Sequence, residues 1–549
     1  MVKKNVHSIS NSLDDNTTVK LRNLQSTIAH ARQVESDMEA ITRSLKEHLA
    51  DPSIYQIDDH LATNVAHLEE IFAGSNDIHI RELFIISLQR KAVIVFVENM
   101  TDQAIINAHI MQKLTITPTN NSSILPPQPT YEYLKNSLLT AASVSAANQM
   151  EAATKRVLSG DTALFVDGLS TVLIIATRKV DSRAISPPET ESDISGPRDG
   201  FTEELRINVS LIRRRIKNPN LVVKRVTVGQ RSETDVAIIY FRGIVNMKFV
   251  HEAEQRLKAL VIDDPTVYGL RGLLEDHPYS PFPTTMTTER PDKFTNALLM
   301  GKVGIVVDGT PYCITIPAMF SDFLQAGDDF YQKWLTATLI RLGRYVTAFL
   351  GLSFPALYVA ITSFHPAFLP TPLALIIGTT REGLPFPSFI EAIIMISLLE
   401  IMQEAGIRLP KTVGSTVSIV GGLVIGDAAV RAGLVSPPIV IVTSFTAIAS
   451  FTIVHYNMSL PLRLLRFMLM ILGASFGIFG VTMGLLAISI HLANLESFGE
   501  PYLAPLAPRN FGALRDLKAT TFISPPKKID KRPAYLETED STRQSNNKE

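Results

Sequence analysis

Apolar residues are concentrated between residues 339 and 495, whereas the first half of the chain alternates short apolar runs with polar stretches. Five runs in the apolar part predict membrane spans: residues 339–364, 388–403, 413–430, 439–454 and 467–492. A sixth piece, 373–378, is much shorter than the roughly 20 residues that a helical span needs, so it predicts a re-entrant or interfacial segment. Pro355 lies inside the first span, where a proline is tolerated if neighbouring groups satisfy the carbonyl that it frees.

Basic residues predict which ends of the spans face the cytoplasm, because cytoplasmic loops are enriched in Lys and Arg. These residues are Arg341, Arg344, Arg408, Lys411, Arg463 and Arg466. Five spans would leave the C-terminus outside, yet the tail is rich in lysine between residues 518 and 531 and indicates a cytoplasmic end. The conflict is resolved if residues 373–378 cross the membrane or if the glycine-rich run turns back.

The first half contains two similar segments, residues 160–175 (GDTALFVDGLSTVLII) and 301–316 (GKVGIVVDGTPYCITI). In both, two apolar runs flank an Asp-Gly pair, which predicts a β-hairpin. The opening glycine and the Asp-Gly pair have the same spacing, so the segments suggest an internal duplication with a mixed or antiparallel sheet.

The predicted fold class is an α+β cytoplasmic N-terminal region of two subdomains, followed by an all-α polytopic membrane domain. The predicted divisions are an arm (1–56), subdomain 1 (57–130), subdomain 2 (131–330), a transmembrane domain (331–495) and a partly disordered cytoplasmic tail (496–549).

Composition excludes several kinds of function. The 549 residues carry a formal net charge of −1, which gives no reason to expect nucleic acid as a partner. The single cysteine, Cys313, allows no internal disulfide and no cysteine zinc cluster. We find no phosphate loop, no metal-ligand spacing and no nucleophile elbow, so we expect no catalysis, no cofactor and no bound metal.

The run 413–430 has two different helical faces. Gly414, Ser418, Gly422 and Gly426 recur every four residues, which predicts a stripe where another helix packs closely. The candidates for a pore-facing or gating side are Thr416, Val420, Leu423, Val424 and Asp427. The alternative is a tightly packed bundle helix with no path beside it.

Three carboxylates fall in or next to the second span: Glu391, Glu400 and Glu404. Carboxylates within a membrane are costly, and by default they mark a site that faces the interior of a helix bundle. The alternative for Glu400 and Glu404 is an interfacial position, paired with Arg408 or Lys411. Glu391 could instead lie at the outer interface.

Four phrases resemble the A subunits of the GerA-type spore germination receptors of endospore-forming bacteria: GPRDGFTE (196–203), YSPFPTTMTTERPDK (279–293), REGLPFPSFIEA (381–392) and EAGIRLPKTVGSTVSIVGGLVIGDAAV (404–430). The resemblance implies a multi-span protein of the spore inner membrane with a cytoplasmic N-terminal region. It implies as partners a permease-like B subunit, which binds the nutrient, and a lipoprotein C subunit. It further implies oligomers that release monovalent cations.

Combining the resemblance with the glycine-rich helix gives a specific hypothesis. In a ring of subunits, Val420 and Leu423 would form an apolar constriction and Asp427 would favour cations. Alternatives are an accessory protein of the same family acting with the dipicolinic-acid release machinery, a proton-coupled transporter that uses Glu391 or Glu400, and a scaffold that only recruits partners.

Overall fold

The computed structural model describes residues 52–115, 131–135, 139, 143–179, 188, 191, 196–259, 267–408, 426–504 and 507. The chain folds into two compact units, Met1–Val180 with Lys217–Val222, and Asp181–Ile216 with Val223–Glu549. The sequence pattern predicts that the first subdomain ends at residue 130. That boundary is wrong, because three strands beyond it belong to the first sheet.

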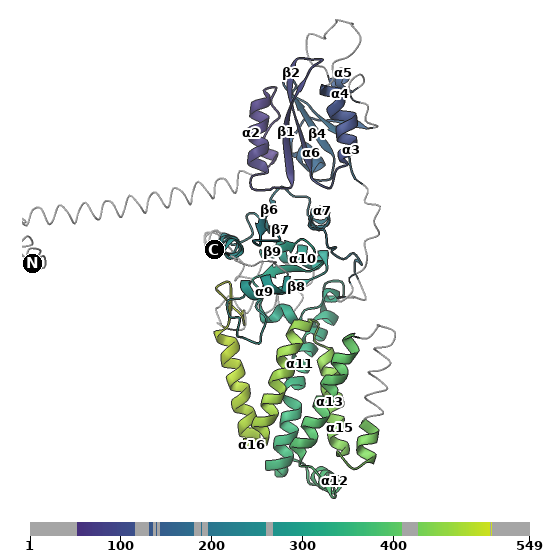
Figure 1. Ribbon diagram of the computed structural model, residues 1–549, viewed down its shortest axis with the longest axis vertical. Coiled ribbons are helices and arrows are strands. Elements are labelled where there is room, and N and C mark those ends of the chain that lie inside the picture. The colour runs from purple at the N-terminus through teal and green to yellow at the C-terminus, as the bar shows by residue number, and fades with distance from the viewer. Residues whose placement is uncertain are drawn as a thin grey trace, which may run out of the picture. The chain divides into compact units, whose positions relative to one another are not determined.

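The first unit is a five-stranded antiparallel sheet with helices on both faces (Figure 1). Its strands are β1 (Ile78–Ile85), β2 (Arg90–Val97), β3 (Val144–Ala147), β4 (Thr162–Val166) and β5 (Val172–Ile175), in the order β1-β2-β4-β5-β3. Its helices are η1 (Pro52–Ile54), α2 (Leu61–Ile71), α3 (Gln103–Ile105), η2 (Ile106–Met111), α4 (Gln112–Thr115), α5 (Tyr131–Tyr133) and α6 (Met150–Val157). Helices α2 and α6 share one hydrophobic cluster with the sheet, and η2 and α4 share another with its opposite face. Because both faces are covered, every residue of β4 is buried, which explains its continuous apolar run.

The α/β part of the second unit repeats this sheet. Its strands are β6 (Leu221–Val228), β7 (Thr234–Phe241), β8 (Met286–Thr288), β9 (Val303–Val307) and β10 (Cys313–Ile316), in the order β6-β7-β9-β10-β8. When the strands of each sheet are numbered 1 to 5 along the chain, both sheets have the order 1-2-4-5-3. The helices are α7 (Leu205–Arg215), α8 (Met247–Lys258), α9 (Val267–Leu274), α10 (Pro291–Leu299), η4 (Phe320–Leu324) and η5 (Gly327–Phe330). Cys313 is buried within β10, as a small apolar residue would be.

The two Asp-Gly turns are also equivalent in detail. Gly168 and Gly309 have φ angles of +85° and +84°, a left-handed conformation that glycine adopts without strain. The Asp167 carboxylate accepts a hydrogen bond from the Leu61 N–H at the start of α2 (3.2 Å). Asp308 accepts one from the Leu205 N–H at the start of α7 (2.9 Å). Each turn therefore also satisfies a free N–H group at a helix N-terminus.

Replacing Asp308 with alanine is expected to lower the free energy of unfolding by about 1 kcal/mol, because the Leu205 N–H loses its acceptor. Asp308→Asn keeps a side-chain oxygen and should retain most of that stability. Urea unfolding of the detergent-solubilised chain, followed by circular dichroism, measures both variants. If the alanine and asparagine variants lost the same free energy of unfolding, the hydrogen bond from Asp308 to the start of α7 would contribute nothing to stability.

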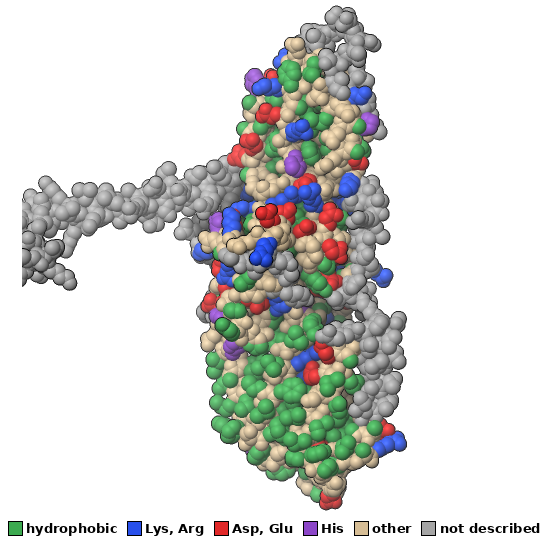
Figure 2. Space-filling view, viewed as in Figure 1, with side chains coloured by type: hydrophobic (Ala, Val, Ile, Leu, Met, Phe, Trp, Pro, Cys, Tyr) green, Lys and Arg blue, Asp and Glu red, His purple; other side chains and the backbone are tan. Residues whose placement is uncertain are grey.

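The helical part of the second unit contains α11 (Trp334–Phe364), η6 (Pro366–Phe368), α12 (Thr371–Arg381), α13 (Ser388–Arg408), α15 (Pro437–Phe451) and α16 (Tyr456–Asn494). Among the described helices, α11 and α16 are long and apolar enough to cross a membrane. The short helix α12 buries none of its side chains. Figure 2 shows hydrophobic side chains covering most of the visible face of this part.

Helix α16 is a hairpin rather than the single span predicted at 467–492. Gly477 has φ 62° and ψ −145° and breaks the helix into two segments. The segments pack closely near the turn, where a Cβ added to Gly480 would lie 2.2 Å from the Leu472 carbonyl oxygen. The second segment returns to the α/β part, where His491 and Ser280 are hydrogen-bonded (2.9 Å).

Residues just after α16 pack on the α/β part of the second unit, although the sequence pattern places them in the tail. Strands β11 (Glu496–Ser497) and β12 (Glu500–Pro501) form a small hairpin. The Ser497 hydroxyl donates to the Thr284 carbonyl (2.7 Å), and the Phe320 N–H donates to the Tyr502 carbonyl (2.9 Å). Phe282 and Phe323 of the α/β part join the hydrophobic cluster of the helices. The end of the described chain is therefore fixed beside the second sheet, at the end of the bundle where α11 begins.

Candidate functional site

Most of the predicted pore helix lies outside the described residues: Gly414, Thr416, Ser418, Val420, Gly422, Leu423 and Val424. Gly426 is described and buried, and a Cβ added to it would meet the Val440 side chain of α15 at 3.4 Å, an ordinary van der Waals contact. Asp427 has a side chain that is 56% exposed, and it forms an ion pair with Arg431 one turn later (2.7 Å).

The helical bundle contains a buried arginine that joins four helices. Arg466, on the first segment of α16, has a side chain that is only 2% exposed. Its guanidinium donates to the Glu400 carboxylate on α13 (3.1 Å) and to the Ser450 hydroxyl on α15 (2.9 Å). Its Nε also donates to the Gly351 carbonyl on α11 (2.9 Å). We call Arg466, Glu400, Ser450 and Gly351 the arginine clamp.

Pro355 explains why Gly351 is available to Arg466. In an α-helix the carbonyl of residue 351 accepts from the N–H of residue 355, but proline has no N–H. Pro355 lies inside α11, so it frees this carbonyl, and Arg466 takes the place of the missing donor. This contact meets the condition under which a proline is tolerated inside a span. Gly351 also packs against Ala449, with 3.1 Å from an added Cβ to that side chain.

The charges of the clamp are unequal. Glu400 pairs with both Arg463 (3.5 Å) and Arg466 (3.1 Å). One carboxylate thus faces two guanidinium groups, and such a cluster repels cations rather than conducting them. The amide group of the buried Gln403, one turn beyond Glu400, has no hydrogen-bond partner among the described residues. The clamp is therefore better suited to holding helices together than to lining a cation path.

Glu391 lies near the opposite end of α13 and is completely buried. It accepts hydrogen bonds from the backbone N–H (2.9 Å) and the hydroxyl (2.7 Å) of Ser436, which precedes α15. The Arg381 guanidinium at the end of α12 lies 3.5 Å away. Glu391 thus joins α12, α13 and α15 in the bundle interior. The third carboxylate, Glu404, is exposed.

Another ion pair lies where η5 meets α11. Asp329 accepts hydrogen bonds from Arg341 (2.9 Å) and Arg344 (2.7 Å). Burial alone raises the pKa of the Asp329 carboxyl, but the bonds from Arg344 and Arg341 outweigh it and hold that pKa below its usual value. The negative charge therefore persists at neutral pH and anchors α11 to the α/β part.

Glu191 and His455 meet at the start of α16. Glu191 accepts from Thr288 (2.8 Å) and Lys293 (3.3 Å), and the His455 ring lies 4.0 Å from its carboxylate. Burial raises the pKa of Glu191 although Lys293 opposes this, and burial together with Lys293 lowers the pKa of His455 to about 3. His455 is therefore neutral at physiological pH, and Lys293 is the positive charge that Glu191 faces.

The sequence indicates Glu400 as a candidate but does not reveal its partner. Arg466 was interpreted as a marker of the cytoplasmic side, whereas it is buried among four helices. The alternative to a site in the bundle interior pairs Glu400 with Arg408 or Lys411, whereas the structure pairs it with two arginines more than 60 residues away. The available signal was Pro355, which required a donor from elsewhere. Among the described residues, no group of three His, Cys, Asp or Glu side chains could hold a metal ion.

Known proteins resemble this chain over most of its length. The model of the family described as Bacillus/Clostridium GerA spore germination protein matches residues 66–535. Spore germination protein GerLA of Bacillus cereus is 35% identical over 490 residues, which cover 89% of this chain and 98% of that protein. The uncharacterized membrane protein YfkQ of Bacillus subtilis strain 168 is 38% identical over 474 residues, covering 86% and 91%. The crystal structure of the N-terminal domain of the A subunit of the Bacillus megaterium spore germinant receptor GerK3 is 31% identical, with a TM-score of 0.38, covering 48% of this chain and 98% of that one.

Proposed function

Because this chain belongs to the GerA family of spore germination proteins, we propose that it is the A subunit of a nutrient germinant receptor in the spore inner membrane. Copies of it assemble into a gated cation channel that opens when germinant is sensed. Its partners are a permease-like B subunit, which binds the nutrient, and a lipoprotein C subunit. We assign it no catalytic role.

The fold of α16 supports a multi-span arrangement with both chain ends in the cytoplasm. Helices α11 and α13, the glycine-rich stretch, α15 and the two segments of α16 make an even number of crossings. The parity conflict of five spans then disappears, because α16 counts twice. The exposed apolar faces of these helices contact lipid, and the two sheet domains lie on the cytoplasmic side.

The arginine clamp is the observation that carries the gating part of this proposal. It links α16 to α11, α13 and α15 through the single side chain of Arg466. The contact with α11 lies where Pro355 has interrupted the backbone hydrogen bonds of that helix. Such a joint has discrete closed and open arrangements rather than a continuous range. Cations pass beside the glycine-rich helix, where Val420 and Leu423 form the constriction and Asp427 attracts cations.

The clamp also bears on the transporter alternative. A proton-coupled transporter needs a carboxylate that exchanges its proton during the cycle. Glu400 is already engaged in ion pairs with two arginines, so a proton exchange at its carboxylate would have to break these contacts. A channel whose helices are held together by these ion pairs therefore agrees better with these contacts.

Replacing Val420 with alanine is expected to widen the apolar constriction. Spores that carry the variant in their receptor should release potassium without germinant and lose dormancy during storage. Potassium release and the loss of heat resistance over time measure this. Ile441→Ala is the matched control, because it removes the same kind of side chain from the outer face of α15, where Ile441 is largely exposed. Fully dormant Val420→Ala spores with unchanged potassium would show that Val420 is not at the gate.

A further inference from the structure

Two of the phrases singled out in the sequence, residues 196–203 and 279–293, meet in the α/β part of the second unit. The Phe201 N–H of the first phrase donates to the Glu289 carbonyl of the second (2.8 Å). We call Glu191 together with residues 196–203 the strap, because both of its pieces are bound to the residues around the start of α10.

Arg290 holds the strap from the inside of the protein. Its side chain is 2% exposed, and its guanidinium donates to the backbone carbonyls of Pro197 (3.3 Å) and Glu191 (3.5 Å). It also donates to both carboxylate oxygens of Asp292 (3.0 and 2.7 Å). Burial alone raises the pKa of the Asp292 carboxyl, but the hydrogen bonds from Arg290 outweigh it and hold that pKa below its usual value.

The same ion pair reaches the residues that lead into α11. The Tyr331 hydroxyl donates to the Asp292 carboxylate (3.1 Å). The Tyr331 ring lies against Gly196 of the strap, where an added Cβ would be 2.7 Å from the ring. Helix α11 begins three residues later, at Trp334.

Glu191 gives the strap a second contact, at the start of α16. The Glu191 carboxylate lies 4.0 Å from the His455 ring. His455 is the N-cap residue of α16, and its carbonyl accepts from the Met458 N–H (3.0 Å). The strap therefore touches the residues that lead into α11 and α16, the two described helices that are long and apolar enough to cross a membrane.

The chain joins the strap to the first unit on both sides. Residues up to Val180 and residues Lys217–Val222 belong to the first unit, whereas residues 181–216 belong to the second. The segment that contains the strap and α7 therefore leaves the first unit and returns to it. At the end of α7, the Arg215 guanidinium donates to both carboxylate oxygens of Asp199 in the strap (2.6 and 2.7 Å).

We propose that the strap couples the first unit to the starts of α11 and α16. A movement of the first unit displaces the strap, and the strap changes how Tyr331 and His455 hold the two helices. In the channel proposed above, the strap is the route from the first unit to the gate, and this role alone rests on the proposed function. Because coupling between two sites is reciprocal, a disturbance at either end of the strap is felt at the other.

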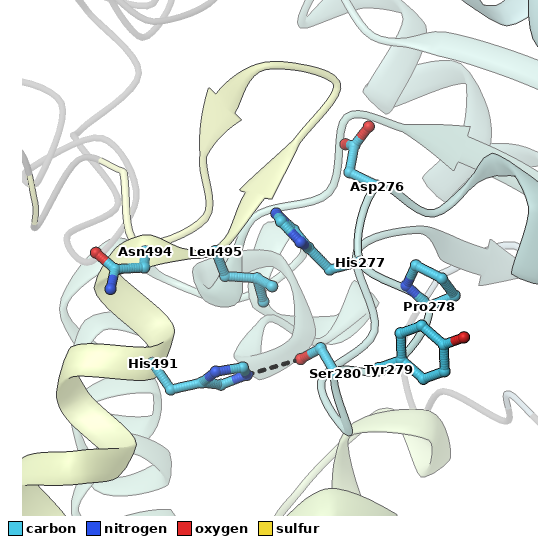
Figure 3. A pocket seen from close by; sticks show the side chains of 8 residues that line it. All are labelled: Asp276, His277, Pro278, Tyr279, Ser280, His491, Asn494 and Leu495. Atoms are coloured by element: carbon cyan, nitrogen blue, oxygen red, sulfur yellow. Dashed lines mark hydrogen bonds between the residues drawn. The ribbon is translucent and has the colours of Figure 1, made fainter.

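The far end of α16 provides an internal reference, because a different segment holds it. There, His491 and Ser280 are hydrogen-bonded (2.9 Å) beside a pocket of about 500 Å³, which Asp276 and Leu495 also line (Figure 3). This attachment is made by the loop after α9.

Hydrogen–deuterium exchange of the purified full-length protein in detergent, measured by mass spectrometry, tests the coupling. Tyr331→Phe keeps the ring against Gly196 and removes only the hydroxyl. We expect this variant to raise the exchange rate of residues 199–203 and 456–464 about threefold, through the loss of one hydrogen bond. Tyr279→Phe is the matched control, because it removes the hydroxyl of a fully exposed tyrosine, and it should change neither segment.

Asp199→Asn tests the opposite direction. It weakens the contact with Arg215, so we expect exchange to rise by a similar factor in residues 331–337 and 456–464. Glu151→Gln is the matched control, because it removes an exposed carboxylate from α6, and it should change neither segment.

Two results would overturn the proposal, with folding of each variant verified by circular dichroism. One is exchange that stays unchanged or rises only in the residues next to each substitution, which would make the strap a local contact. The other is an equal rise around His491 and Ser280, which would show a general loss of stability. Because these measurements involve no ion flux, their failure is separable from failure of the proposed channel.

Discussion

Replacing Arg466 with methionine is expected to lower the free energy of unfolding by about 3–5 kcal/mol, the cost of breaking a buried ion pair from one side. The loss leaves the Gly351 carbonyl and the Ser450 hydroxyl without the guanidinium. It also leaves Glu400 with only the longer contact to Arg463 (3.5 Å). Urea or thermal unfolding in detergent, followed by circular dichroism, measures the effect.

Arg463→Met is the matched control for this prediction. The Arg463 side chain is 16% exposed against 2% for Arg466, and it reaches Glu400 at 3.5 Å instead of 3.1 Å, so its loss should cost clearly less than the loss of Arg466. Pro355→Ala adds a second check, because alanine at this position has the backbone N–H that donates to the Gly351 carbonyl in a regular α-helix. In a protein that carries Pro355→Ala, Arg466→Met should lower the free energy of unfolding by about 0.5–1.5 kcal/mol less than it does in the wild type, which is the value of one hydrogen bond. Equal effects of Arg466→Met and Arg463→Met would contradict the account of the clamp.

Replacing Gly477 with alanine is expected to lower the free energy of unfolding by about 2–5 kcal/mol and to open the α16 hairpin. The backbone at Gly477 (φ 62°, ψ −145°) is available almost only to glycine. The added Cβ would also lie 2.7 Å from the His365 ring and 3.0 Å from the Phe364 Cβ. Thermal unfolding and limited proteolysis of the segment after residue 477 measure the two parts of the effect.

Gly343→Ala is the control for the hairpin. Gly343 lies within α11, and a Cβ there would meet nothing within 4 Å. Alanine should therefore leave the stability unchanged or raise it by up to about 1 kcal/mol, because alanine is the better helix former. If Gly477→Ala were tolerated as well as Gly343→Ala, α16 would be a continuous helix and the even number of crossings would be lost.

Short-range patterns in the sequence correctly predicted one hairpin in each sheet. The Asp-Gly pairs at 167–168 and 308–309 predicted two hairpins and a duplication, and the two sheets have the same strand order. The boundary predicted at residue 130 is wrong. It follows from residues 117–129, a stretch rich in proline, asparagine and serine that has the composition of a linker between domains. The pairing of β2, which precedes that stretch, with β4, which follows it, shows that the sheet continues.

Long-range contacts explain what the sequence could not predict in the helical part. An uninterrupted apolar run over 467–492 has the same composition whether it is one helix or a hairpin, and only the backbone at Gly477 distinguishes them. Arg466 lies at the edge of such a run, where arginines usually face water. Its burial depends on a carbonyl freed in α11 and a carboxylate on α13, neither of which its neighbours in the sequence reveal.

Cation release from liposomes tests the central claim most directly. The full-length protein would be purified as an oligomer, reconstituted with potassium inside the vesicles, and compared with Val420→Ala at equal protein density. A gated channel predicts slow potassium release from wild-type liposomes and faster release from the variant, both rising with the amount of oligomer. Release no faster than from empty liposomes for both proteins, with oligomers verified in the membrane, would contradict the claim that this chain forms the channel.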